Sequence, residues 1–175
     1  CTKPGDHVTE AILGLEKNDY HSLKYYKTFS PIMQSKLSSF LKNHGRLFVS
    51  GSYIGSDMKC TDEQNFLSNI LKLKYADSCK VNTDSVIMDS GLHFNIYHSV
   101  NEKHYAATSP ECFLPVDSAY SLMRYSNGNN SCICYDENDY RCITMGFPFE
   151  CIALPDARDA VMDKILKLLS KQHLK

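Results

Sequence analysis

A helix signal followed without a linker by a strand signal is the feature that most constrains this chain. Ser30 and Pro31 form a typical helix start, since the serine oxygen can accept from a free amide and proline suits the first helical position. Apolar residues then recur at helical spacing, namely Met33, Leu37, Phe40 and Leu41. Gly45 is expected to end the helix in a left-handed conformation, and Arg46–Gly51 (RLFVSG) reads as a strand directly after it. The helix is therefore expected to pack back onto the sheet that contains this strand.

An earlier apolar run makes this helix a crossover between two strands. Val8–Leu15 (VTEAILGL) has the β-branched and aliphatic content of a buried strand. Strand, helix and strand form a βαβ unit, whose two strands are parallel. A second crossover helix is expected near Thr61, which fits a capping box with Gln64, and Lys72–Ala76 follows it as a short strand. We therefore predict an α/β fold in three layers, with a mainly parallel sheet flanked by helices.

The C-terminal half carries signals for antiparallel pairing. Leu92–Tyr97 alternates apolar and polar residues, the period of a strand with one buried face, and we place it towards a sheet edge. Ser121–Tyr125 and Cys132–Tyr135 read as further short strands. Asp136–Asp139 has the composition of a hairpin turn that leads into Arg141–Phe147. We therefore expect an antiparallel hairpin near the C-terminal end of the sheet.

The chain is expected to end in a helix over Asp156–Leu174. Its inward-facing residues are predicted to be Ala160, Ile165, Leu168 and Leu169. Lysines gather towards its C-terminal end, where the helix dipole favours positive charge. The polar stretch Asp77–Gly91 has no clear pattern, and no element is predicted there.

Size and charge limit the classes of function. With 175 residues, of which 43% are hydrophobic, the chain can bury a core as one α/β domain over residues 1–175. A formal net charge of −1 supplies no field that would attract nucleic acid, so we expect no nucleic-acid partner. No apolar run reaches the roughly 20 residues that a membrane span needs. Because the chain begins with Cys1, we expect it to be a fragment of a longer multidomain protein.

Eight cysteines raise the question of a metal site. Cys132 and Cys134 form C-x-C on a predicted strand, where alternation points both to one face, and Cys142 lies on the predicted partner strand. A zinc site is one interpretation, but no second pair supplies the remaining ligands at a familiar spacing. Buried thiols or one disulfide are the favoured interpretation, so no metal is predicted. So many cysteines also favour export.

The turn after Arg46–Gly51 is the first place to look for a ligand, because ligands gather beyond the carboxyl ends of strands in open parallel sheets. It reads Gly51-Ser52-Tyr53-Ile54-Gly55, and glycines four apart after a strand suit a sharp turn that exposes its central side chain. That residue is Tyr53, whose phenol is a weak nucleophile unless it is activated. The candidate ligand-binding residues are Ser50, Gly51, Ser52, Tyr53, Asp57 and Glu150. If a rearranged catalytic site exists, its candidates are Ser52, Tyr53 and Glu150.

Two segments carry a resemblance to a known family. A strand followed by G-x-Y-x-G, and a late strand that ends in GFPFE at residues 146–150, resemble the class I glutamine amidotransferases. In that family the turn is G-x-C-x-G and the late strand ends near F-H-P-E. Tyr53 stands at the cysteine position and Pro148 at the histidine position, while Glu150 matches the glutamate. The resemblance implies a flavodoxin-like, amidotransferase-like scaffold without amidotransferase chemistry.

A narrower resemblance rests on LFVSGSYIGSDM at residues 47–58, MRY at 123–125 and GFPFE. Together they look like a domain of bacterial proteins named xanthan-lyase-like or golvesin-related. This resemblance implies a secreted, cell-surface or periplasmic protein, with neighbouring domains of the same protein as partners and carbohydrate as a candidate ligand. We therefore expect a non-catalytic accessory or binding domain of a glycan-related protein.

Two alternatives remain open. The first is a hydrolase or polysaccharide lyase with a rearranged site near Tyr53 and Glu150, since a tyrosine can serve as a base in sugar elimination. The second is a flavin or nucleotide binder of the flavodoxin-like class. The chain has no glycine-rich phosphate loop, which disfavours that class, and no cofactor is expected.

Overall fold

The computed structural model describes residues 28–58, 60–76, 81, 83–99, 104, 106–137 and 139–171. Its helices are α2 (Pro31–Lys42), α3 (Thr61–Asn69), the short 3-10 helix η2 (Phe149–Cys151) and α4 (Pro155–Ser170). Its strands are β1 (Arg46–Ser50), β2 (Leu73–Tyr75), β3 (Ser85–Met88), β4 (His93–Asn95), β5 (Phe113–Pro115), β6 (Tyr120–Tyr125), β7 (Asn130–Asp136) and β8 (Arg141–Met145). The predicted strand Val8–Leu15 lies outside the described residues.

The described strands form a six-stranded mixed sheet and a separate two-stranded sheet. The large sheet has the order β1-β8-β7-β6-β3-β4, and β2 pairs with β5 in the small one. Within the large sheet β1 and β8 are parallel, whereas the other neighbouring pairs are antiparallel. The prediction of a mainly parallel sheet is therefore wrong for the described part. The physical reason is that short turns join β6 to β7, β7 to β8 and β3 to β4, and a chain that reverses in a short turn can pair only antiparallel.

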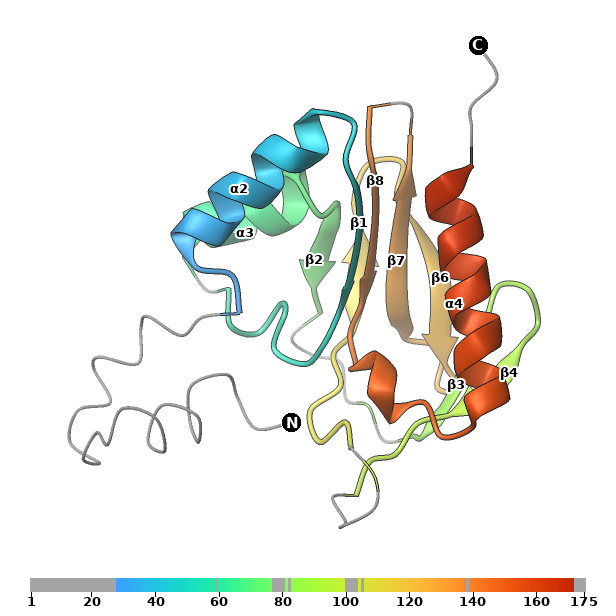
Figure 1. The fold of residues 1–175 in the computed structure, drawn as a ribbon. Helices are drawn as coiled ribbons and strands as arrows, with labels where there is room; N and C mark the ends of the chain where they lie inside the picture. Colours follow the sequence, from blue (N-terminus) through green and yellow to red (C-terminus); the bar gives the residue numbers. More distant parts are fainter. Residues whose placement is uncertain are drawn as a thin grey trace, which may run out of the picture.

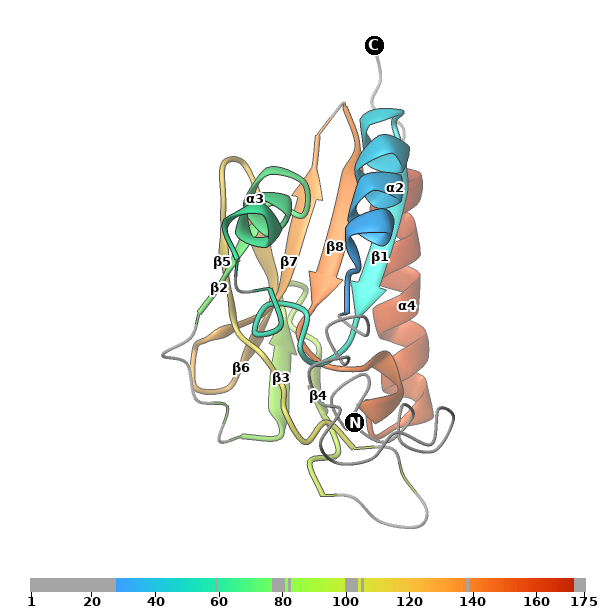
Figure 2. The ribbon, with the colours of Figure 1, turned by 90° about the vertical axis from the view of Figure 1, so that its left-hand side faces the viewer.

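Helices cover both faces of the large sheet. The long α4 lies along one face, while α2, α3 and the small sheet lie on the other (Figures 1 and 2). Each interface has its own apolar cluster. One contains Cys132, Cys134, Ile143, Met145, Val161 and Ile165, and the other contains Leu41, Phe66, Leu67, Leu73, Ile133 and Cys142. The predicted three-layer arrangement is therefore present around a differently paired sheet.

Helix α2 begins as the sequence predicts but ends differently. Ser30 caps it, with its Oγ accepting from the Met33 amide at 3.3 Å. The left-handed residue after the helix is His44, at φ 59°, and not Gly45. Gly45 is needed for space, because a Cβ there would lie 2.4 Å from the carbonyl oxygen of Phe40. Leu41 is fully buried, whereas the predicted inward residues Met33 and Phe40 are 47% and 49% exposed.

Helices α3 and α4 differ in detail from the sequence-based predictions. The amide of Cys60 donates to the Glu63 carboxylate at 3.0 Å, so the residue that caps α3 is Cys60 and its partner is Glu63, not Thr61 and Gln64. The predicted stripe of α4 includes Ile165, which is fully buried, but Ala160 is exposed. Leu168 and Leu169 are partly buried and pack against the core as predicted, and Ala157 and Val161 are further buried residues of α4.

The strand predictions have mixed outcomes. The strand predicted at Leu92–Tyr97 is β4, at the edge of the described sheet, and the hairpin of β7 and β8 is confirmed. The strand predicted near Lys72–Ala76 exists as β2, but it belongs to the small sheet. β3 lies in the stretch for which no element was predicted. Its own sequence has no clear strand pattern, and its pairing with β6 stabilises it as a strand.

The cysteines divide between the two faces. Cys132 and Cys134 lie in the cluster beneath α4, as expected for C-x-C on a strand. Cys142 lies in the other cluster, so it does not share a face with that pair. Cys112 is disulfide-bonded, whereas Cys60, Cys132, Cys134, Cys142 and Cys151 form no disulfide. Over the described part of the chain, no group of three or more His, Cys, Asp or Glu side chains is arranged to hold a metal ion.

None of the described helices combines the length and the apolar character needed to cross a membrane.

Candidate functional site

The structure brings together the two segments that carry the family resemblance. The parallel pairing of β1 with β8 places Ser50 opposite Met145, and the Gly51 amide donates to the Met145 carbonyl at 3.2 Å. Beyond the strand ends, the Ser50 hydroxyl accepts from the Phe149 amide at 3.4 Å. The turn after β1 and the segment after β8 therefore form one region at the carboxyl ends of two parallel strands.

Tyr53 occupies the central position of a strained turn. Its φ is 63°, in the left-handed region that a non-glycine residue rarely adopts. The Tyr53 hydroxyl donates to Ser109 Oγ at 2.8 Å, and the backbone carbonyl of Tyr53 accepts from the Thr28 hydroxyl at 3.2 Å. The backbone strain of a nucleophile elbow is thus present, but the side chain at its centre is held by a hydrogen bond to a neighbouring loop.

Glu111 is the residue of this region that sequence reasoning missed. Its side chain is 4% exposed, and its two carboxylate oxygens accept from the Gly55 and Ser56 amides at 2.8 and 2.9 Å. Successive backbone amides of a turn form an anion-binding nest, and here the anion is a side chain of the same protein. No motif around Glu111 signals this role, because its partners lie 55 and 56 residues earlier in the chain.

Backbone bonds hold Glu111 in place. Its amide donates to the Gly146 carbonyl at 2.7 Å, and its own carbonyl accepts from the buried Tyr125 hydroxyl at 3.0 Å. Gly146 must lack a side chain, because a Cβ there would lie 2.3 Å from the Glu111 carbonyl oxygen. The GFPFE segment therefore supports the turn through Glu111 as well as through Ser50.

The remaining predicted site residues have different surroundings. Ser52 is buried, and its Oγ has no hydrogen-bond partner within the described residues. Asp57 accepts from the Thr28 amide at 2.9 Å, a long-range contact that joins the turn to the segment before α2. Glu150 is exposed on η2. The catalytic roles suggested for Ser52, Tyr53 and Glu150 remain predictions.

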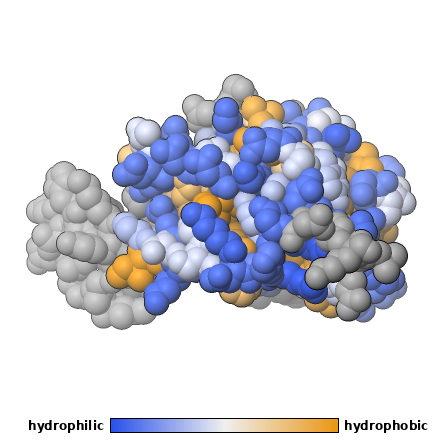
Figure 3. Space-filling view, turned by 90° about the horizontal axis from the view of Figure 1, so that it is seen from above, coloured by the Kyte–Doolittle hydropathy of each residue, from blue (hydrophilic) through white to orange (hydrophobic). Residues whose placement is uncertain are grey.

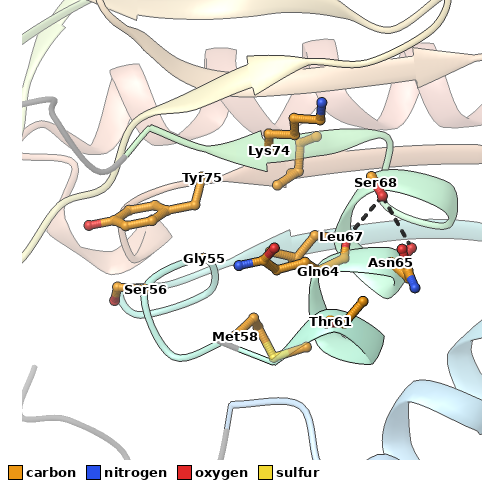
Figure 4. Close-up of a pocket in the computed structure, with 11 residues that line it drawn as sticks. Gly55, Ser56, Met58, Thr61, Gln64, Asn65, Leu67, Ser68, Lys74 and Tyr75 are labelled. Carbon is orange, nitrogen blue, oxygen red and sulfur yellow. Dashed lines mark hydrogen bonds between the residues drawn. The ribbon is translucent and has the colours of Figure 1, made fainter.

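A groove lies beside the turn, between residues 55–58, α3 and β2. Its volume is about 760 Å³. A polar stripe of α3 lines one side, formed by Thr61, Gln64, Asn65 and Ser68 (Figure 4). Met58, Leu67 and Leu73 form its buried apolar floor, and Lys74 and Tyr75 of β2 line the other side. This volume falls within the range of small-molecule sites.

Gly55 links the groove to the turn. A Cβ at Gly55 would lie 2.7 Å from the Cβ and a ring carbon of Tyr75. The Tyr75 side chain therefore packs directly on the backbone whose amide binds Glu111. The second glycine of the G-x-Y-x-G motif is required by this close packing, whereas Gly51 has only an ordinary contact with Ile54, at 3.9 Å.

Comparisons with known proteins give similarity at the level of the fold. No family model and no curated protein matches the chain. The N-terminal domain of mmIFT52 is 10% identical with a TM-score of 0.55, and the match covers 99% of this chain and 93% of that one. The GH42 β-galactosidase Gan42B is 14% identical with a TM-score of 0.55, over 80% of this chain and 20% of that one.

A third solved structure is the exo-β-1,4-mannosidase Op5Man5 from Opitutaceae bacterium strain TAV5. It is 13% identical with a TM-score of 0.49, over 82% of this chain and 23% of that one. The chain thus spans about a fifth of the length of the two glycosidases that it matches. The similarity to Gan42B and to the mmIFT52 domain is consistent with an amidotransferase-like fold that also occurs within a larger glycosidase chain.

Proposed function

We propose that this chain is a non-catalytic accessory or binding domain of a larger, exported, glycan-related protein. The observation that carries the proposal is the occupancy of the turn after β1. The amides of Gly55 and Ser56 bind the internal carboxylate of Glu111, and the Tyr53 hydroxyl is bound to Ser109. Backbone amides that stabilise a reaction's negative charge have to be open to the substrate. In this turn the two amides are already bonded to Glu111, so they stabilise the fold and are not open to a substrate.

Two further observations support the context of the proposal. The fold matches a fifth of a β-galactosidase chain, which favours a domain that works beside others. Cys112 is disulfide-bonded, and disulfides persist mainly in oxidising compartments, which favours export to the cell surface, the periplasm or the medium.

A second candidate function is a hydrolase or lyase with a rearranged site near Tyr53 and Glu150. The left-handed backbone of Tyr53 favours it, since such strain gathers at functional sites. This candidate requires a substrate to displace Ser109 from the Tyr53 hydroxyl, because that bond engages the group that would act as the base.

One experiment separates the two candidates. The purified protein would be incubated with polysaccharides, aryl glycosides, esters and amides, and product formation followed by mass spectrometry. A non-catalytic domain gives no product above the buffer control. Turnover that disappears in Tyr53→Phe or Glu150→Gln would overturn the proposal, provided that circular dichroism shows both variants to be folded.

A further inference from the structure

The groove between residues 55–58, α3 and β2 is lined mostly by residues of α3 and β2, which lie outside the turn after β1 and outside the motifs that carry the family resemblance. Its rim on α3 consists of Thr61, Gln64, Asn65 and Ser68. These positions are spaced i, i+3, i+4 and i+7, so they form one continuous face of the helix. The buried residues of the same helix include Phe66 and Leu67, and Leu67 also forms part of the groove floor. The helix therefore presents a second, polar face to the groove.

The polar and aromatic groups that line the groove favour one class of ligand. Primary amides and hydroxyls each donate and accept hydrogen bonds, which matches the hydroxyl groups of a sugar. Tyr75 adds an aromatic ring beside a floor of Leu67 and Leu73, and such a surface suits the apolar C–H groups of a pyranose. No carboxylate is among the described lining residues, and Lys74 contributes one positive charge. A nucleotide or polyanion would call for more cationic groups.

The rim of the groove disfavours a protein partner that docks through apolar contacts. On the face of the molecule that is seen from above, most residues are hydrophilic and the hydrophobic residues form separate patches (Figure 3). Thr61, Gln64 and Asn65 on the rim are exposed, while the apolar residues Met58 and Leu73 lie buried beneath them. Protein interfaces concentrate large apolar and aromatic residues at their centres, whereas this groove has a polar rim over a narrow apolar floor.

We infer that this groove binds a neutral oligosaccharide, with Gln64 and Asn65 as hydrogen-bonding side chains and Tyr75 as the apolar platform. This inference rests on the proposed glycan-related function and assigns the ligand class and the site. Tyr75 is suited to the role because its packing on Gly55 orients the ring before any ligand arrives. A preoriented side chain loses less conformational entropy on binding, which increases affinity.

The test is a titration of the isotopically labelled protein with lactose, cellotriose, mannotriose and a β-1,4-galacto-oligosaccharide, each up to about 10 mM, where a dissociation constant near 1 mM is readily measured. Backbone amide shifts of Gln64, Asn65, Ser68 and Tyr75 should change with at least one sugar. The double variant Gln64→Ala/Asn65→Ala should weaken that binding about tenfold or more, the effect of losing roughly 1.4 kcal/mol. Asn69→Ala is the matched control, since Asn69 is an exposed residue of the same helix outside the groove lining.

Each outcome decides one claim. Shifts in the groove that the double variant abolishes and the control retains support the inference. The inference is overturned by the absence of shifts with all four sugars, by shifts that map elsewhere, or by a double variant that is folded and binds normally. Cleavage of a sugar during the titration would instead contradict the proposed non-catalytic function, so the two claims fail on different readouts.

Discussion

Replacing Glu111 with glutamine should destabilise the protein strongly, although the two side chains have nearly the same shape. The carboxylate accepts from the buried Gly55 amide at 2.8 Å and from the partly buried Ser56 amide at 2.9 Å. In glutamine one of these oxygens becomes an NH2 group, which faces an amide that also donates. One charge-assisted bond is lost and a buried donor is left unpaired, each worth about 1 to 3 kcal/mol. The removal of a buried charge offsets part of this cost, so the expected net loss is about 2 to 4 kcal/mol.

Thermal unfolding followed by circular dichroism measures this effect. For a chain of this size each kcal/mol corresponds to roughly 2 to 4 °C, so the melting temperature should fall by roughly 4 to 16 °C. Glu150→Gln is the control, because it makes the same chemical change at an exposed position and should alter stability by less than about 0.5 kcal/mol. Hydrogen exchange at the Gly55 and Ser56 amides should accelerate only in the Glu111 variant. A Glu111→Gln protein that melts with the wild type and keeps both amides protected would refute the role assigned to Glu111.

Three further predictions follow from the packing around this region. Gly146→Ala should cost about 2 to 3 kcal/mol in a urea titration, because its Cβ would lie 2.3 Å from the Glu111 carbonyl oxygen, whereas Gly51→Ala should be tolerated. Arg141→Ala should lower the free energy of unfolding by about 3 kcal/mol, because it removes a buried ion pair with Asp136 at 2.5 Å. Burial raises the pKa of Cys134 to about 11 and that of Cys142 to about 12, so the free energy of unfolding should fall as the pH rises from about 9 towards these values.

These three predictions have their own controls. For Gly146, equal losses in the two glycine variants would show that backbone entropy, not the contact with Glu111, sets the cost. For Arg141, Lys164→Ala is the comparison, since the pair of Lys164 with Asp89 is partly exposed, at 3.6 Å, and should contribute little. For the thiols, the folded state binds more protons than the unfolded state in that pH window, so the stability they contribute is complete below pH 9. A double Cys134→Ala/Cys142→Ala variant should therefore show a shallower decline.

Arg141 also explains how the end of α4 is held. Its guanidinium donates to the Leu169 carbonyl at 3.0 Å and to the carbonyl of Lys171. The last carbonyls of a helix lack partners within the helix, so a buried guanidinium there satisfies them. The hairpin of β7 and β8 and the C-terminal end of α4 are thereby joined through one side chain.

The candidate site was only partly predictable from the sequence. The sharp turn with Tyr53 at its centre follows from a strand and two nearby glycines, and the structure brings it beside the GFPFE segment that shares the family resemblance. Glu111 was not predictable, because a lone glutamate after a proline carries no pattern until the fold places it against the turn. The groove also went unrecognised, since the polar stripe of α3 reads as ordinary solvent-facing sequence until β2 lies opposite it.

The elements whose signals are local could be predicted from neighbouring residues alone. The start of α2 at Ser30, the strand β1, the hairpin of β7 and β8 and the helix α4 all depend on capping, periodicity or turn residues that neighbours in the chain provide. The direction of most strands, the position of β3 and the burial of Glu111 are set by long-range packing instead. Those features depend on contacts between residues far apart in sequence, and the free energy of such contacts comes from partners that no local pattern can identify.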